Sequence, residues 1–501
     1  MNFISHIPAL LIVLPLVAAP LCVIARNSLL AFLLAVSANA IVFLMAIYLF
    51  FRTVLMSGLY NIGASHYELG GWSAPTGIEF YVDILNAALV LLLTLISLLA
   101  LCFSKKSIQK EIPEYRHYLF YAGWLLCLTG LLGISLTGDV FNVFVFLEIS
   151  SLSMYMLIAM GKDKKHAVLA AFRYLILGSI GASFILLGIG FLYAATGTLN
   201  MFDLSQRLPD IENSRTLLVA FSFIAVGLFV KTAIFPVYSW LPDAYQYAPS
   251  SVTAFLSGTA TKVSLYVFLR FFFHIFGTDY SFGVLFLGKL LLPLSVVGFS
   301  VMSVIAIFQT DIRRMLAYSS IAQISYIMMA ISMGTEAGLV AGIVHMINHA
   351  FIKTALFLAV GCIFYRLGSA RVTDMSSLIR LMPWTTSAFI IAALSLIGIP
   401  LTAGFISKWY LVLAAIDSGW WLIVLMILFS SLMAIIYLGR IIELMCSGNQ
   451  QDNVTDIREA PLSMLIPLWI LILISLTVGI NGSFVVDIAQ LAADQLLGGM
   501  E

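Results

Sequence analysis

The chain has 501 residues, of which 62% are hydrophobic and only 10% are charged. Soluble domains usually contain about 25% charged residues, so this composition excludes a soluble globular protein and indicates a polytopic membrane protein. The formal net charge of +1 gives no reason to expect nucleic acid or an acidic substrate as a partner.

The cysteines and the first residues predict neither covalent cross-links nor a cleaved leader. Five cysteines are scattered without a CxxC pair, at Cys22, Cys102, Cys127, Cys362 and Cys446. We interpret them as small hydrophobic residues, with no role in disulfides or metal binding. The opening MNFISH lacks a basic segment, so the first apolar run is expected to be a retained span.

Apolar runs of membrane-spanning length predict fourteen helices, because about 20 apolar residues are needed to cross a bilayer. The expected spans are 6–25, 29–51, 80–103, 117–136, 139–160, 167–195, 216–240, 252–276, 284–308, 314–333, 337–365, 384–411, 419–442 and 462–481. An even number of spans brings both termini to the same side. The predicted fold is therefore an all-α polytopic bundle of about fourteen transmembrane helices.

The basic residues between these spans divide unevenly between the two sides of the membrane. One set of loops holds 15 of them, namely Arg26, Lys105, Lys106, Lys110, Arg116, Lys162, Lys164, Lys165, Arg313, Arg314, Arg366, Arg371, Arg380, Arg440 and Arg458. The opposite loops hold three, which are Arg52, Arg207 and Arg215. Because cytoplasmic loops are enriched in basic residues, both termini are predicted to lie outside the cytoplasm.

Several charged residues fall at or near the ends of the expected spans. Arg173, Arg270 and Lys289 lie close enough to a span end for their long side chains to reach the lipid headgroups, which is the role we expect. Asp83, near the start of the third span, and Asp243, just after a proline, are expected to be interfacial. Either carboxylate could line a mouth of a polar path.

Five further charges lie deeper in the bundle: Glu148, Lys231, Lys262, Lys353 and Lys408. A lysine at the centre of a bilayer costs roughly 2.5–3.5 kcal/mol, so such groups face protein or water and not lipid. We therefore expect the five groups to be paired with each other or hydrated, and to mark a polar path through the bundle.

Prolines interrupt two of the expected spans. Pro236 and Pro242 break the seventh span after Lys231, and Pro400 breaks the twelfth before Lys408. Interrupted helices at corresponding positions of two halves are typical of inverted-repeat transporters. Spans 4–8 and 9–13 would form the repeats, giving an N-terminal region at 1–103, repeats at 117–276 and 284–442, and a C-terminal span and tail at 443–501. The alternative is that the prolines only kink ordinary helices.

His345, His349 and Lys353 recur every four residues in the eleventh span and share one helical face. Histidine titrates near neutrality, so such a stripe can relay protons. The alternative is a pair of core histidines bonded to backbone or serine. A zinc site is disfavoured, because Met346 stands where a zinc peptidase has its glutamate.

Glu148 and Lys231 are expected to pair across two spans. Opposite charges keep each other ionised, whereas burial drives both groups toward neutrality, so the pair could act as a switch. When a proton or cation arrives, the pair could separate and Lys231 could pass a proton toward Lys262. The alternative is a static salt bridge that orders two helices.

Long stretches of the sequence resemble the antiporter-like membrane subunits of respiratory complex I, membrane-bound hydrogenases and Mrp-type Na+/H+ antiporters. The similar stretches are GDVFNVFVFLEISSLSMYML, KTAIFPVYSWLPDAYQYAPSSVTAFLSGTATKVSLY, DIRRMLAYSSIAQISYIMM, HMINHAFIKTALF and GIPLTAGFISKW. They cover about residues 80–445. The residues around Glu148 and the lysine at position 408 look most like those of the Mrp D subunit.

The resemblance implies fourteen core helices, inverted repeats at spans 4–8 and 9–13, and broken helices 7 and 12. It implies that Glu148 corresponds to the family's glutamate of span 5, and that Lys231, Lys262 and Lys408 correspond to its lysines of spans 7, 8 and 12. His345 and His349 would be connecting groups.

The implied function is proton translocation within a multisubunit Na+/H+ antiporter, and the alternative is a proton-pumping subunit of a redox complex of the complex I or hydrogenase type. Other membrane subunits, the bilayer, protons and Na+ are the expected partners. No cofactor and no catalytic chemistry of its own are expected. The expected location is a bacterial or archaeal cytoplasmic membrane.

Overall fold

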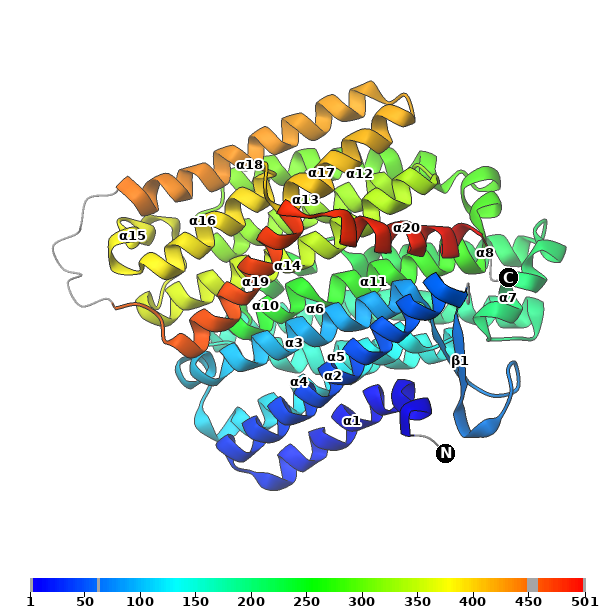
Figure 1. The fold of residues 1–501 in the computed structure, drawn as a ribbon, viewed down its shortest axis with the longest axis horizontal. Coiled ribbons are helices and arrows are strands. Elements are labelled where there is room, and N and C mark those ends of the chain that lie inside the picture. The colour runs from blue at the N-terminus through cyan, green and yellow to red at the C-terminus, as the bar shows by residue number, and fades with distance from the viewer. Residues whose placement is uncertain (1–2, 61–63, 448–457, 499–501) are drawn as a thin grey trace.

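The computed structural model describes residues 3–60, 64–447 and 458–498 as a bundle of helices. Within these residues, twelve helices are long and apolar enough to cross a membrane. The long helices run side by side along the long axis of the molecule (Figure 1). Two further predicted spans, 314–333 and 384–411, are also helical but polar or interrupted, so the bundle has the predicted all-α architecture.

The N-terminal region consists of η1 (Phe3–His6), α1 (Ile7–Ala25), α2 (Ser28–Tyr60), β1 (Ser65–Glu68), η2 (Leu69–Gly71), β2 (Glu79–Val82) and α3 (Ile84–Glu111). Spans 4–8 consist of η3 (Glu114–Arg116), α4 (His117–Leu136), α5 (Val140–Ala159), α6 (Lys164–Thr196), α7 (Met201–Arg207), η4 (Leu208–Ile211), α8 (Arg215–Thr232), α9 (Trp240–Tyr247), α10 (Ser250–Gly258), α11 (Ala260–Leu269) and η5 (Arg270–Ile275).

Spans 9–13 follow η6 (Asp279–Val284) and consist of α12 (Leu287–Ile307), α13 (Ile312–Ile331), α14 (Glu336–Leu367), η7 (Val372–Met375), α15 (Leu378–Leu381), α16 (Pro383–Ile397), α17 (Ala403–Asp417) and α18 (Trp421–Ser447). The chain ends with α19 (Leu462–Ile480) and α20 (Ser483–Leu497).

The two ends of the bundle differ in what they carry. Both termini, the β1–β2 hairpin and α7 lie at one end, here called the terminal end, and α15 lies at the opposite end, here called the basic end (Figure 1). The 15 basic residues counted above belong to the basic end, partly in its loops and largely in the adjoining ends of helices. Because α4 starts at the basic end and α12 starts at the terminal end, the two groups of five spans run in opposite directions.

The fourth span of each group is broken, as predicted. Span 7 is divided into α8 and α9 by residues 233–239, which include Pro236, and span 12 is divided into α16 and α17 by residues 398–402, which include Pro400. Pro242 does not break the helix as expected, because it lies in the first turn of α9, where the missing amide is tolerated. A further break, at Thr259 between α10 and α11, was not predicted.

Helix α14 lies at the centre of the bundle. It packs against α3, α10, α13, α16, α17, α19 and α20. Most of its side chains are buried, including His345, His349 and Lys353. Helix α13 beside it is almost wholly buried too, which explains how a helix containing Ser319, Ser320 and other polar residues is accommodated in a membrane bundle. The predicted polar stripe therefore faces protein.

A short antiparallel hairpin at the terminal end was not predicted. Strand β1 pairs with β2, and the third span begins at Ile84, after an Asp83 cap, and not at residue 80 as expected. The buried carboxylate of Glu79 accepts hydrogen bonds from His66 Nδ1 at 2.9 Å and from Asn200 Nδ2 at 2.6 Å. Glu79 therefore ties the hairpin to the loop that precedes α7.

The His66–Glu79 pair predicts a pH dependence for the hairpin. The hydrogen bond to Glu79 raises the pKa of His66. Burial acts to raise the pKa of Glu79, but hydrogen bonds from His66 and Asn200 outweigh burial and lower it. The histidine's contribution to stability is complete below its ordinary pKa of about 6.5 and is lost as pH rises through the raised value. The carboxylate's contribution is lost only as pH falls through its lowered value.

We therefore expect hydrogen exchange of residues 65–82, corrected for intrinsic rates, to be slower at pH 5.5 than at pH 8.5. A His66→Ala variant should lose most of this difference, because the titrating partner is gone. Equal protection at both pH values in the unsubstituted protein would contradict the prediction.

Residues after the last predicted span form an additional helix, where only a tail was expected. Helix α20 packs against α3 and α14 and buries Val485, Ile488, Ala492 and Leu496. The backbone amide of Ile84, at the start of α3, donates to Gln495 Oε1 at 3.2 Å. The C-terminal segment thus lies along the face of the bundle toward the terminal end, and Gln495 reaches the first turn of α3 (Figure 1).

Candidate proton pathway

Glu148 of α5 and Lys231 of α8 form the ion pair that was expected from the sequence. Lys231 Nζ lies 3.9 Å from Glu148 Oε1 and donates a hydrogen bond of 2.9 Å to Ser151 Oγ. The lysine side chain is 3% exposed, whereas that of Glu148 is 27% exposed. Both charges are thus partly satisfied, and the pair lies between two spans of the first group. Its role as a switch stays a prediction.

The end of a half-helix positions Lys231. It occupies the last turn of α8, where free carbonyl groups favour a positive charge. The indole of Trp240, the first residue of α9, donates to Val230 O at 2.9 Å and so satisfies one of these carbonyls. The break in span 7 therefore holds the lysine at a fixed depth beside α5.

A small cavity adjoins Lys231. Its volume is about 20 Å³, and its lining includes Ser151, Tyr174, Lys231, Val263 and Ser264. This volume holds about one water molecule, and the hydroxyl and ammonium groups provide hydrogen-bonding partners. Because Val263 and Ser264 follow Lys262 directly in the chain, the cavity offers a place for water between Lys231 and α11.

Lys262 and Lys408 each cap the C-terminal end of a half-helix. Lys262 is fully buried and donates to Ser257 O in the last turn of α10, and its Nζ lies 3.4 Å from Thr261 Oγ1. Lys408 donates to Ile397 O, the last residue of α16, at 2.8 Å and to Ser431 Oγ at 3.0 Å. Carbonyl groups freed by a helix break thus stabilise a lysine in each group of spans.

Lys353, on α14, is stabilised by α13. Its Nζ donates to Leu316 O at 2.9 Å and to Ser319 Oγ. Within residues 3–60, 64–447 and 458–498, Lys262, Lys353 and Lys408 form no ion pair. Of the five deep charges, which were expected to be paired or hydrated, Glu148 and Lys231 pair with each other, whereas these three lysines bind carbonyl and hydroxyl oxygens.

The two histidines of α14 form a stacked pair, of which His345 contacts α17. Their ring centroids are 6.2 Å apart with an interplanar angle of 2°. His345 Nδ1 lies 3.0 Å from Ser407 Oγ, and Ser407 precedes Lys408. The Nε2 atom of His345 and both ring nitrogens of His349 are buried without a hydrogen-bonding partner among the described residues. Free ring nitrogens of this kind are available to bind water and to carry protons.

The predicted residues thus fall into groups connected by direct contact and separated by gaps. Glu148, Ser151 and Lys231 form one group, and His345, Ser407 and Lys408 belong to another. His345 of the second group lies on α14, which packs so close to α10 that a Cβ atom at Gly258 would lie 2.2 Å from Thr354 Oγ1. Water molecules would have to bridge the remaining distances from Lys231 through Lys262 to the histidines.

Two expectations about peripheral charges are wrong. Arg270 was expected to reach the headgroups and Asp83 to be interfacial, yet both side chains are buried and form an ion pair with each other. Arg173 pairs with Asp243, which also accepts from Arg314 Nη1 at 3.4 Å. Each carboxylate lies on a helix remote in sequence from its arginine, and for this reason the pairing could not be read from a single span.

Comparison with known proteins shows the family of the chain. A family model described as NADH:quinone oxidoreductase/Mrp antiporter, TM, matches residues 137–434, which include every predicted pathway residue. The chain belongs to this family of membrane subunits.

Among the described residues, no group of three His, Cys, Asp or Glu side chains could hold a metal ion.

Relatives carry the names of both branches of the family. The chain is 39% identical to the N subunit of the NADH-quinone oxidoreductase of Desulforudis audaxviator over 93% of this chain and 94% of that protein. It is 30% identical to the D subunit of the Na(+)/H(+) antiporter of Bacillus subtilis over 97% and 96% of the two chains.

Solved structures share the fold over nearly the whole length. A chain of the Mrp complex from Dietzia sp. aligns with a TM-score of 0.88 at 23% identity, covering 99% of this chain and 98% of that one. A chain of the membrane-bound sulfane sulfur reductase, an archaeal respiratory membrane complex, also gives 0.88, at 31% identity and 98% coverage of both. The all-α fold of this family member is thus the fold of subunits within large membrane assemblies.

Proposed function

We propose that this chain is the proton-translocating subunit of a multisubunit Na+/H+ antiporter, in which protons move along the buried Glu148, Lys231, Lys262, His345, His349, Lys353 and Lys408. The observation that carries the proposal is the Glu148–Lys231 pair beside the break of span 7. A charge pair at a broken helix inside a membrane bundle is costly to bury and adds little stability, so a function is the better explanation for it.

The exposed part of Glu148 supports a place for this chain beside another subunit. Its side chain is 27% exposed on a face of α5 that also presents the apolar Phe141, Leu152 and Met156. A carboxylate facing lipid at this depth is unfavourable. We infer that a neighbouring membrane subunit covers this face, so that protons or cations reach Glu148 across a subunit boundary.

We further propose how the chain is divided and how it is oriented in the membrane. Residues 117–276 and 284–442 act as two half-units of opposite direction, flanked by residues 1–103 and 443–501. The basic end faces the cytoplasm of a bacterial or archaeal cell, because basic loops remain on the cytoplasmic side of the cytoplasmic membrane. Both termini then lie outside the cytoplasm.

A second candidate is a proton-pumping subunit of a redox complex. The 39% identity to a protein named as the N subunit of an NADH-quinone oxidoreductase favours this candidate. In that case the same residues move protons, and partner subunits supply the electron transfer that drives them.

Two measurements test the proposal. The chain is purified with its native partners to identify them, and proton movement is measured in everted membrane vesicles. An antiporter subunit should give proton movement that depends on added Na+ and persists without an electron donor. Proton movement driven only by NADH, hydrogen or another donor would support the redox candidate instead. An assembly that moves no protons under either condition would contradict both.

A further inference from the structure

A second polar stripe runs along α11 and η5 toward the terminal end. Lys262, Tyr266, Arg270 and His274 are spaced four residues apart and follow one face of this segment. Residues 270–275 form a wide helical turn, in which the amide of Phe276 bonds to the carbonyl of Phe271, five residues earlier, at 2.8 Å. Turns of this kind are frequent at functional sites. The stripe begins at a proposed pathway residue.

The middle of the stripe is a fully buried charge network. Arg270 pairs with Asp83, the cap of α3, and the side chains are 4% and 1% exposed. Arg270 Nε donates to the Tyr266 hydroxyl at 3.0 Å, and this hydroxyl donates to Ser135 O at 3.0 Å. The guanidinium keeps its proton, so Asp83 is the member of the network that can take one up.

His274 lies at the outer end of the stripe. Its ring stacks on Tyr81 with centroids 6.2 Å apart, and both ring nitrogens are buried without a hydrogen-bonding partner among the described residues. His274 also lines a cavity of about 380 Å³, together with Ser205, Glu212 and Asp279. This space is large enough for many water molecules. A buried imidazole without protein partners is costly, and rotation of the ring toward the cavity would let water satisfy it.

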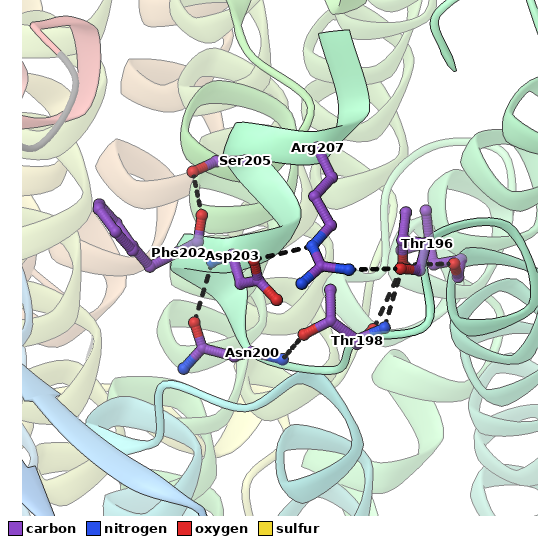
Figure 2. A network of polar contacts seen from close by, with 8 residues as sticks. Thr196, Thr198, Asn200, Phe202, Asp203, Ser205 and Arg207 are labelled. Carbon is purple, nitrogen blue, oxygen red and sulfur yellow. Dashed lines mark hydrogen bonds and ion pairs between the residues drawn. The ribbon is translucent and has the colours of Figure 1, made fainter. Parts of the chain in front are cut away.

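A polar network holds the wall of this cavity in place (Figure 2). The side chain of Asn200 accepts from the Asp203 amide at 3.0 Å and caps α7. Arg207 Nε donates to Asp203 Oδ1 at 2.8 Å, and Arg207 Nη1 donates to Thr196 O at 3.0 Å. Helix α7 and the turn after it, which contribute Ser205 and Glu212, are thereby fixed against the end of α6.

We propose that this cavity is an aqueous port at the terminal end, through which His274 exchanges protons between water and Lys262. The Asp83–Arg270 pair forms the barrier between them. In the outward direction, the Lys262 ammonium gives a proton through water to Asp83 and becomes a neutral amine. Protonated Asp83 holds Arg270 less tightly and passes the proton to a ring nitrogen of His274. His274 releases it to cavity water, and Asp83 and His274 return to their initial states.

This inference rests on the proposed function, because it assigns the route by which protons from Lys262 reach the water outside the bundle. It also explains why Arg270 and Asp83 are buried as a pair: the carboxylate compensates a permanent charge that would otherwise repel protons from the stripe. The adjoining Glu212 and Asp279 favour cations and protons at the mouth of the cavity.

The first test compares proton movement by the purified assembly in vesicles. We expect His274→Ala and His274→Gln to lower it at least tenfold without loss of assembly. His6→Gln is the control, because it removes another histidine of the terminal end, which bonds to Tyr67 outside the stripe. Unchanged movement in both His274 variants, with movement abolished in Lys231→Ala, would overturn the port and leave the proposed function standing. Unchanged movement in Lys231→Ala as well would remove the proposed function.

The second test measures access and does not depend on transport. A His274→Cys variant is exposed to a membrane-impermeant, positively charged methanethiosulfonate reagent from each side of the membrane, and the modified residue is identified by mass spectrometry. Thr76→Cys, on the exposed hairpin loop, marks the terminal end, and the native exposed Cys446 marks the basic end. Modification from the side that labels position 76 supports the port. No modification, or modification from the Cys446 side alone, overturns it.

Discussion

Replacing Lys231 with alanine is expected to lower cation-dependent proton movement about 100-fold or more while leaving the assembly intact. Lys231 is the only basic side chain in the described residues that pairs with Glu148, and it adjoins the cavity that leads toward α11. Alanine removes the proton carrier and leaves Glu148 without its counter-charge. The fold should tolerate the change, because the 3.9 Å between Lys231 Nζ and Glu148 Oε1 is too long for a hydrogen bond and holds α5 and α8 together only weakly.

Glu148→Gln should have an effect of similar size, because glutamine keeps the shape of the side chain but cannot exchange charge with Lys231. Lys289→Ala is the matched control: this lysine belongs to α12 but is exposed and lies over the ring of Phe286, 4.0 Å from its centroid. Proton uptake into everted vesicles, with subunit content checked by gel, is the measurement. Transport at the level of Lys289→Ala in both variants would refute the switch.

Replacing Gly404 with valine should have the largest effect on the stability of the subunit. A Cβ atom at Gly404 would lie 1.7 Å from the backbone oxygen of Ser395. The two halves of span 12, α16 and α17, can therefore pack this closely only with glycine at position 404. Overpacking against backbone typically costs about 1–3 kcal/mol or more, because neither partner is the flexible end of a side chain. Separation of the halves would also remove Ile397 O from Lys408, which now donates to it at 2.8 Å.

We therefore expect Gly404→Val to lower the thermal midpoint of the purified assembly and to reduce its yield in membranes. Gly439→Ala is the control on the neighbouring span, because nothing lies within 4 Å of a Cβ atom at Gly439. Alanine is favoured over glycine in a helix by up to about 1 kcal/mol, so this control should be neutral or slightly stabilising. Equal thermal midpoints for the two variants would show that α16 and α17 do not pack as described.

Membrane chemistry made much of the architecture predictable from the chain alone. The number of apolar runs of membrane-spanning length predicts the number of spans. The high cost of buried charge indicated Glu148 and Lys231, which do lie together. Prolines located the breaks at residues 233–239 and 398–402, although Pro242 proved to be part of a regular helix. The break at Thr259 has no proline, and for this reason it was not predicted.

Hydropathy, periodicity and the position of prolines are properties of a single segment, and they were enough to establish a helical membrane bundle with two broken spans and a buried row of titratable groups. Contacts between distant segments decided the rest. Arg270 meets Asp83, 187 positions away, and α20 closes over α3 because packing brings those surfaces together. Lys262 and Lys408 are satisfied by carbonyl groups that become available only where a helix ends, and this depends on the folded backbone.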